Sequence, residues 1–104
     1  MQPPTLSNEQ RSAASAKAVA NRRRRAEVKD QIRSGELTWS DLLKLAESDD
    51  VVAAIQVREA LMALPGVGPR RVERYMAHAK VSQTRRLRGL GERQLELLAE
   101  VLNQ

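Results

Sequence analysis

Residues 64–74 read Leu-Pro-Gly-Val-Gly-Pro-Arg-Arg-Val-Glu-Arg, in which two closely spaced glycines precede a basic run. Gly66 and Gly68 can take backbone conformations closed to other residues, and they place no Cβ between the chain and a ligand. Pro69 suits the first turn of a following helix, where its missing N–H costs no hydrogen bond. A helix start presents unpaired N–H groups and the positive end of the helix dipole, and both favour phosphate. This glycine turn (residues 64–69) therefore predicts an anion-binding connection between two helices.

A second basic stretch, which we call the arginine segment, follows at residues 84–91 with the sequence Thr-Arg-Arg-Leu-Arg-Gly-Leu-Gly. Arginine binds phosphate through paired, charge-assisted hydrogen bonds. We expect the glycine turn and the arginine segment to fold into one cationic surface. Each also has a plainer interpretation, as an ordinary helix connection or as arginines in a solvated loop. The candidate binding residues of the two stretches are Pro65, Gly66, Val67, Gly68, Arg70, Arg71, Arg74, Arg85, Arg86, Arg88 and Gly89.

The first part of the chain predicts one long helix. Ser7 and Gln10 have the spacing of a capping box, no Gly or Pro interrupts residues 8–33, and Gly35 is a typical residue after a helix end. Large apolar residues occur only near the end of this helix, at Val28 and Ile32. We therefore expect residues 1–34 to form a helical arm whose last third docks on a body of residues 35–104.

The body is also expected to be helical. Helices are predicted from Trp39 with Thr38 as N-cap, from Ser48-Asp49-Asp50 to Leu64 with a break near Gln56, over residues 69–79, and over residues 92–102. No segment alternates apolar and polar residues with the period of a strand. The sequence thus predicts an all-α protein with a long N-terminal helix and a small multi-helix body.

Basic and acidic residues are unevenly distributed along the chain. Residues 1–34 hold eight Lys/Arg and three Asp/Glu, residues 35–64 hold two and six, and residues 65–104 hold eight and four. The net charge of +5 therefore hides two basic blocks around an acidic middle. Such sorting favours two basic surfaces that face polyanions, whereas solubility alone does not require it. In the arm, Arg11, Arg22, Arg25, Lys29 and Arg33 fall on one helical stripe, which is either a solvated face or a second binding surface.

The sequence lacks the residues and motifs that several functional classes require. The chain has no cysteine, and His78 is its one histidine. It contains neither a Gly-x-Ser-x-Gly motif nor a P-loop, so we expect no enzyme, metal or cofactor and no small-molecule substrate. No apolar run of about 18 residues could cross a membrane. Trp39 and Tyr75 are more typical of core positions than of base-stacking platforms, which favours duplex over single-stranded nucleic acid.

Taken together, the glycine turn, the arginine segment and the long Ala/Arg-rich first helix resemble the actinobacterial integration host factor family. The similarity covers nearly the whole chain, including Glu9-Gln10-Arg11 and residues 25–29. It implies a body of the helix-two-turns-helix type, as in a small-subunit ribosomal protein. It also implies a cytoplasmic, nucleoid-associated protein, expected to be a monomer, that binds double-stranded DNA with little sequence preference and bends it.

The resemblance also assigns roles by position. It implies that the glycine turn approaches the DNA minor groove and its phosphates, with Arg85, Arg86 and Arg88 on the same face. A second surface on the long helix maps onto Arg22, Arg25 and Lys29. This chain departs from the family at Pro69, where a lysine is common, so one charge and one N–H are absent.

Two other classes of function stay open. The body type recurs in ribosomal proteins, and basic arms thread into structured RNA, so an RNA-binding or ribosomal-type protein is the alternative. A third class is a small interaction module whose basic blocks meet an acidic protein. Preference for duplex DNA or for hairpin RNA, or binding to neither, separates the three.

Overall fold

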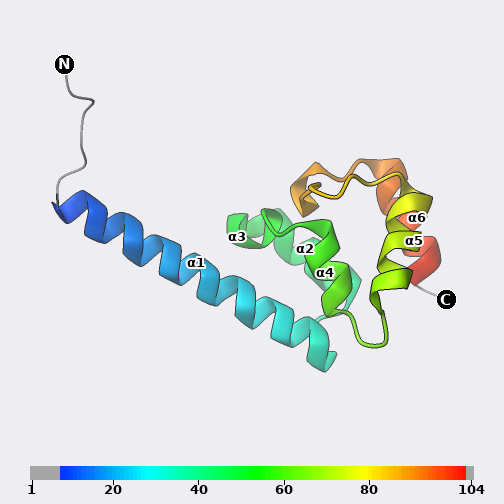
Figure 1. The fold of residues 1–104 in the computed structure, drawn as a ribbon, viewed down its shortest axis with the longest axis horizontal. Coiled ribbons are helices and arrows are strands. Elements are labelled where there is room, and N and C mark those ends of the chain that lie inside the picture. Colours follow the sequence, from blue (N-terminus) through cyan, green and yellow to red (C-terminus); the bar gives the residue numbers. More distant parts are fainter. Residues whose placement is uncertain (1–7, 103–104) are drawn as a thin grey trace, which may run out of the picture.

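The computed structural model describes residues 8–102, which form an all-α molecule with one long helix and a compact body (Figure 1). Helix α1 spans Asn8–Ser34, and its 27 residues measure about 40 Å at about 1.5 Å per residue. Gly35 ends α1 at a positive φ of 86°, as the sequence predicts. Ser7, the predicted cap of this helix, lies outside the described residues.

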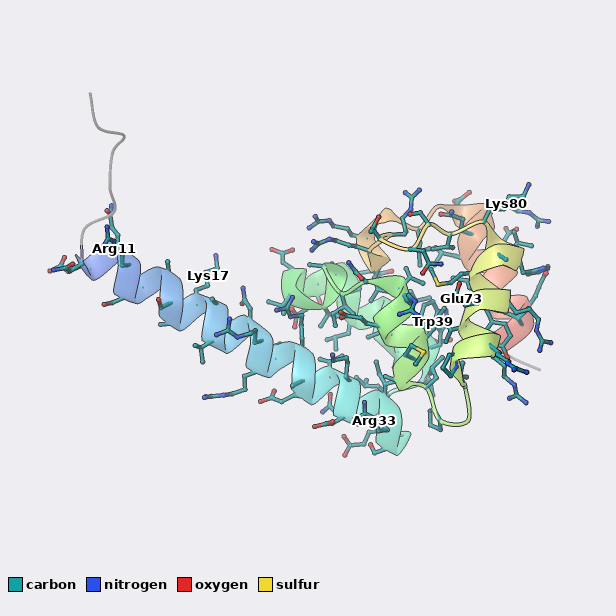
Figure 2. The ribbon with its side chains drawn as sticks, viewed as in Figure 1. Arg11, Lys17, Arg33, Trp39, Glu73 and Lys80 are labelled. Atoms are coloured by element: carbon teal, nitrogen blue, oxygen red, sulfur yellow. The ribbon has the colours of Figure 1, made fainter. Side chains whose placement is uncertain are left out.

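The second half of α1 provides the buried contacts with the body, and Figure 2 shows Arg11 on the half that projects from it. Every residue from 8 to 20 is exposed, whereas Val28 and Ile32 are fully buried. An ion pair reinforces this docking, because Arg24 Nε lies 3.1 Å from Asp49 Oδ2. Figure 1 shows the first turns of α1 extending away from the other helices.

Helix α2 (Trp39–Ser48) begins with a complete capping box. The Thr38 hydroxyl accepts from the Asp41 N–H at 3.1 Å, and the Asp41 carboxylate accepts from the Thr38 N–H at 3.0 Å. These bonds satisfy two N–H groups that have no partner within the helix. They also hold the pKa of Asp41 below its ordinary value, because the Thr38 N–H and then its hydroxyl favour the carboxylate.

The helical stretch that follows α2 is interrupted near Gln56, as the sequence predicts. Helix α3 (Asp50–Ala53) is capped by Asp49, and α4 (Val57–Ala63) begins after Gln56 in extended conformation. Asp49 Oδ1 accepts from Val51 N–H at 3.0 Å and from Val52 N–H at 3.3 Å. Among residues 8–102 no β-strand forms, although one isolated antiparallel bridge pairs Gln56 with Arg86.

Helices α5 (Pro69–Ala79) and α6 (Glu92–Leu102) pack against each other and agree with the predicted bounds. Lys80 ends α5 in the left-handed conformation, with φ of 56°. Gln94 links the two helices, because its Nε2 donates to Lys80 O at 2.9 Å and its Oε1 accepts from Gly91 N–H at 3.1 Å. A short 3₁₀ helix, η1 (Leu87–Gly89), precedes α6.

The core is aliphatic, as the absence of phenylalanine requires. Trp39 lies in it with 8% exposure, which confirms its predicted packing role. Tyr75, which the sequence predicts at a core position, is only half-buried, and Leu95 and Leu102 on α6 are half-buried as well. The completely enclosed large side chains are Val28, Ile32, Leu42, Val52, Ile55, Val57, Leu61, Val72, Met76 and Leu98.

The Arg24–Asp49 pair predicts an acid-sensitive contribution to stability. Burial of Asp49 raises its pKa, but Val52 N–H, the Arg24 guanidinium and Val51 N–H together outweigh it, so the pKa is lowered. Because the folded value lies below the unfolded value of about 3.9, the carboxylate stabilises the fold above about pH 4. That stability is lost as the pH falls through the folded value. Asp49→Asn keeps a capping oxygen, so its free energy of unfolding is expected to change less between about pH 5 and pH 3 than that of the wild type. Urea unfolding at several pH values measures this, and equal slopes would contradict it.

Candidate nucleic-acid interface

The glycine turn is a type II β-turn that leads directly into α5. Val67 N–H donates to Leu64 O at 3.3 Å, Pro65 occupies the second position and Gly66 the third, with φ of +75°. This third position requires a positive φ, so glycine is the residue that fits it without strain. Pro65, Gly66 and Gly68 are all exposed. The turn therefore presents its backbone to solvent.

The start of α5 has no side-chain cap. Gly68 is the N-cap residue, in extended conformation, and it carries no oxygen that could accept from the first turn. Pro69 fills the first helical position, and the N–H groups of Arg70 and Arg71 lie in the first turn, where an α-helix supplies no acceptor. A helix start of this kind is open to an anion.

Three arginines surround this helix start. Arg70, Arg71 and Arg74 are exposed and line one open hollow with Gly66, Gly68 and Pro69. Arg71 Nη1 donates to Gly66 O at 3.1 Å, which ties the arginine to the turn. A guanidinium has five N–H donors, so Arg71 keeps others for a ligand. The structure thus brings the predicted residues of the turn and of α5 together.

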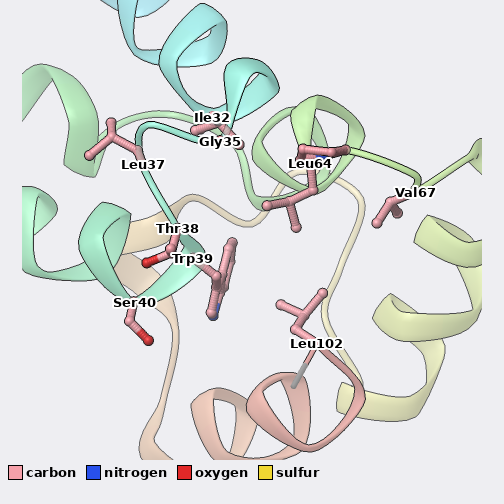
Figure 3. A pocket seen from close by; sticks show the side chains of 10 residues that line it. Ile32, Gly35, Leu37, Thr38, Trp39, Ser40, Leu64, Val67 and Leu102 are labelled. Atoms are coloured by element: carbon pink, nitrogen blue, oxygen red, sulfur yellow. The ribbon is translucent and has the colours of Figure 1, made fainter. Parts of the chain in front are cut away.

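Apolar packing holds the turn from its inner side. Leu64 and Val67 of the turn line a hollow of about 380 Å³ together with Trp39 and Leu102. Figure 3 shows these side chains around it. The indole Nε1 of Trp39 is buried and has no hydrogen-bond partner within residues 8–102. The apolar side chains of the turn therefore face inward, while its glycines stay outside.

The arginine segment is fixed by backbone hydrogen bonds to the start of α4. Leu87 N–H donates to Ile55 O at 2.9 Å, Val57 N–H donates to Arg85 O at 2.9 Å, and Leu87 itself is buried. The side chains of Arg85, Arg86 and Arg88 are exposed. Arg85 Nη1 donates to Gly89 O at 3.0 Å, and Arg86 Nη1 donates to Ala54 O at 3.2 Å.

The glycine turn and the arginine segment adjoin opposite ends of α4, so the single cationic surface expected of them stays a prediction. The arginine segment pairs with residues at the N-terminal end of α4, whereas the glycine turn begins at Leu64, which ends α4. The seven residues of α4 separate them by about 10 Å, at about 1.5 Å per residue. Figure 1 shows the two connections at opposite ends of that helix. Sequence spacing could not reveal this, because it depends on how the returning chain pairs with Ile55 and Val57.

One residue of the arginine segment, Arg86, also comes near a hollow beside the arm. Lys17, Asn21 and Arg25 of α1 share an open hollow with Asp50, Val51 and Ala54, and Arg86 bonds to the carbonyl of that same Ala54. Arg25 and Lys29 are half-buried, and Arg22 is exposed but does not line the hollow. Sequence reasoning missed Lys17, although it stands at helical spacing from Asn21 and Arg25.

Within residues 8–102, no cluster of His, Cys, Asp and Glu side chains is suited to hold a metal ion. No helix in this range combines the length and apolar character needed to span a membrane.

Comparison with known proteins identifies the family. Residues 32–102 match the family described as "S13-like H2TH domain". The chain is 46% identical to an integration host factor of Mycobacterium tuberculosis over 97 residues, covering 93% of this chain and 92% of the relative. It is 40% identical to an integration host factor of Streptomyces coelicolor over 95 residues, covering 91% and 89%.

A solved structure supports the same relationship. The structure described as "Structure of sIHF bound to an 8bp palindromic DNA" aligns with a TM-score of 0.78 and 36% sequence identity. The alignment covers 84% of this chain and 98% of the solved one. With this fold and this extent of identity, the chain belongs to the integration host factor family of mycobacteria and Streptomyces, whose body is an S13-like H2TH domain.

Proposed function

We propose that this chain is a non-enzymatic, nucleoid-associated architectural protein that binds duplex DNA through phosphate and minor-groove contacts. The observation that carries the proposal is the exposed, uncapped start of α5, with Gly66 and Gly68 open to solvent and three arginines around it. The solved relative is described as bound to a palindromic DNA, which supports DNA as the polyanion.

The proposed contacts form two surfaces. The hairpin surface consists of Pro65, Gly66, Val67, Gly68, Arg70, Arg71 and Arg74. Arg85, Arg86, Arg88 and Gly89 of the arginine segment are proposed to accompany the hairpin surface. The arm surface consists of Arg22, Arg25 and Lys29 from the helical arm of residues 1–34. Phosphate contacts of this kind position a protein on DNA but carry no base information, so we expect weak sequence preference.

Two surfaces on one chain have a mechanical consequence. A duplex seated on one surface can bend to reach the other, or the second surface can take a second duplex. A monomer could therefore bend one DNA or bridge two, which is how architectural proteins act through deformation. Acting in this way, the chain would reside on the bacterial chromosome.

The affinity for DNA and the bending of DNA require separate measurements. Gel shifts with several unrelated duplexes over a range of salt concentrations test affinity, base preference and the number of phosphate contacts. A ring-closure assay with short DNA fragments tests bending. Faster ring closure and similar affinities for all duplexes support the proposal. Preference for hairpin RNA over duplex DNA would instead favour the ribosomal-type alternative, and binding to neither would favour an acidic protein partner.

The Gly68→Ser variant tests whether the start of α5 is an anion-binding site or an ordinary helix start. Gly68 is extended, with no atom within 4 Å of an added Cβ, so serine fits there and its hydroxyl can cap the first turn of α5. Serine is a slightly better N-cap than glycine, so we expect stability to rise by about 0.3 kcal/mol. The same hydroxyl competes with phosphate for the N–H groups, and duplex affinity is expected to fall about tenfold, the loss of one charge-assisted hydrogen bond. Thermal unfolding and gel shifts measure the two effects. Raised stability with unchanged affinity would contradict the assignment.

A further inference from the structure

The outer face of α5 carries a polar hollow beyond the hairpin surface. Its lining residues are Arg71, Arg74, Tyr75 and His78 on α5, with Val101 of α6 beside them. The four α5 positions have offsets of three, four and seven from Arg71, so they lie on one face of the helix. Arg71 and Arg74 also line the hollow at the glycine turn, so the two hollows share two arginines. We call this second hollow the α5 hollow.

The cations of the α5 hollow are available to a ligand. Arg74 has no hydrogen bond or ion pair within residues 8–102, and Arg71 uses one donor on Gly66 O. The acidic residue of α5, Glu73, does not line the hollow. Its carboxylate accepts from Arg58 Nε at 3.3 Å and from Gln83 Nε2 at 3.1 Å. The α5 hollow therefore combines two arginines and a tyrosine hydroxyl, a set that suits the oxygens of a phosphodiester.

The charge of the α5 hollow depends on whether the His78 imidazole is protonated. Its side chain is 46% exposed, and Nε2 lies 3.4 Å from Glu100 Oε2 on α6. The charged groups near this imidazole are Arg74 one turn earlier on α5 and Glu100 on α6. Glu96, one turn before Glu100, is paired with Arg93 at 3.1 Å. With Arg71, Arg74 and Glu100 the site carries a formal +1, which becomes +2 when His78 is protonated.

We propose that the α5 hollow binds backbone phosphates of the duplex seated at the glycine turn, and that protonation of His78 strengthens this binding. The inference rests on the proposed function, because it extends the hairpin surface along α5. Arg71 and Arg74 supply guanidinium donors, Tyr75 supplies a hydroxyl, and protonated His78 offsets the repulsion between Glu100 and phosphate. Histidine is the side chain that ordinarily changes charge between pH 5 and 8, so duplex affinity is compared within that range in the test below.

The test measures binding of a mixed-sequence duplex by fluorescence anisotropy at about pH 6 and about pH 8. At low salt the affinity is expected to be about threefold higher at the lower pH, and the salt slope larger by up to about 0.9, the value of one phosphate contact. His78→Gln is expected to lose this difference. His78→Lys, which keeps a cation, is expected to bind tightly at both pH values.

Matched variants keep the result specific. The α-amino group of the chain also titrates, near pH 7.7–8.0 in general, and any pH dependence left in His78→Gln measures that contribution. Arg74→Gln is expected to weaken binding about threefold and reduce the salt slope by about 0.9. Lys44→Gln removes the same charge at an exposed position of α2 outside the α5 hollow and is expected to have little effect.

The outcomes distinguish this inference from the proposed function. Strong duplex binding with no pH dependence, or a pH dependence fully retained in His78→Gln, overturns the role of His78 and leaves the hairpin surface intact. Absence of duplex binding at both pH values overturns the proposed function and this inference with it. Equal thermal stability of the wild type and His78→Gln, expected for a residue this exposed, shows that the variant is folded.

Discussion

Replacing Arg85, Arg86 and Arg88 with alanine is expected to weaken duplex binding by about a hundredfold and to flatten its salt dependence. Each arginine lost from a phosphate contact costs about 1 kcal/mol of binding and about 0.9 in salt slope. The loss should be similar for unrelated duplexes, because phosphate contacts carry no sequence information. Gel shifts at several salt concentrations provide both numbers.

Two controls isolate the position and the chemistry of these arginines. Replacing Arg23, Lys44 and Arg93 with alanine removes the same charge from exposed positions outside the proposed surfaces and should change affinity far less. Replacing the three segment arginines with lysine keeps the charge but loses the planar fork, so the salt slope should stay near that of the wild type. Arg86 also bonds to Ala54 O, so thermal unfolding must accompany each measurement. An unchanged salt slope in the alanine variant would remove the arginine segment from the interface.

The largest effect on stability is expected from Trp39→Ala. This side chain is 8% exposed and lies between Ile32, Leu64 and Leu102, in a core that otherwise lacks large aromatic residues. Truncating a buried tryptophan costs about 3–5 kcal/mol, a large share of the stability of a chain of this size. The melting temperature should fall by about 15 °C or more. Because Trp39 shares its hollow with Leu64 and Val67, duplex affinity should fall as well.

Trp39→Phe tests the physical reason for this effect. The indole Nε1 has no hydrogen-bond partner within the described residues, so phenylalanine removes an unsatisfied buried donor while keeping most of the apolar volume. We expect this variant to lose much less stability than Trp39→Ala. Val19→Ala, at a 42% exposed position of α1, serves as the matched control for losing an apolar side chain and should change little. Equal losses in the alanine and phenylalanine variants would show that Nε1 is hydrogen-bonded in solution.

Local sequence patterns were sufficient for the secondary structure. Thr38 and Asp49 cap helices where expected, the break falls at Gln56, and Pro69 begins α5. Each of these features depends on side chains within about one helical turn, so neighbouring residues alone specify it. The type II turn at Pro65 and Gly66 is equally local, because proline sets one backbone angle and glycine permits the next.

Local sequence patterns do not predict which residues the basic side chains contact. Arg24 looks like any other member of the run from Arg22 to Arg25, yet it alone in that run pairs with Asp49. The approach of His78 to Glu100 depends on how α5 packs against α6. Both contacts join residues more than twenty positions apart, and sequence separation alone says nothing about which side chains meet.

The sequence by itself determined the helices, their caps, the glycine turn and the aliphatic composition of the core, because local backbone preferences and apolar spacing specify them. The tertiary structure alone decided that the arginine segment returns to the start of α4, whereas the glycine turn follows the other end of that helix. Burial of Leu87 and its N–H bond to Ile55 O fix that return, and both require partners distant in the chain. The sequence therefore gives the charge of each basic block, whereas packing decides on which surface of the folded chain the block lies.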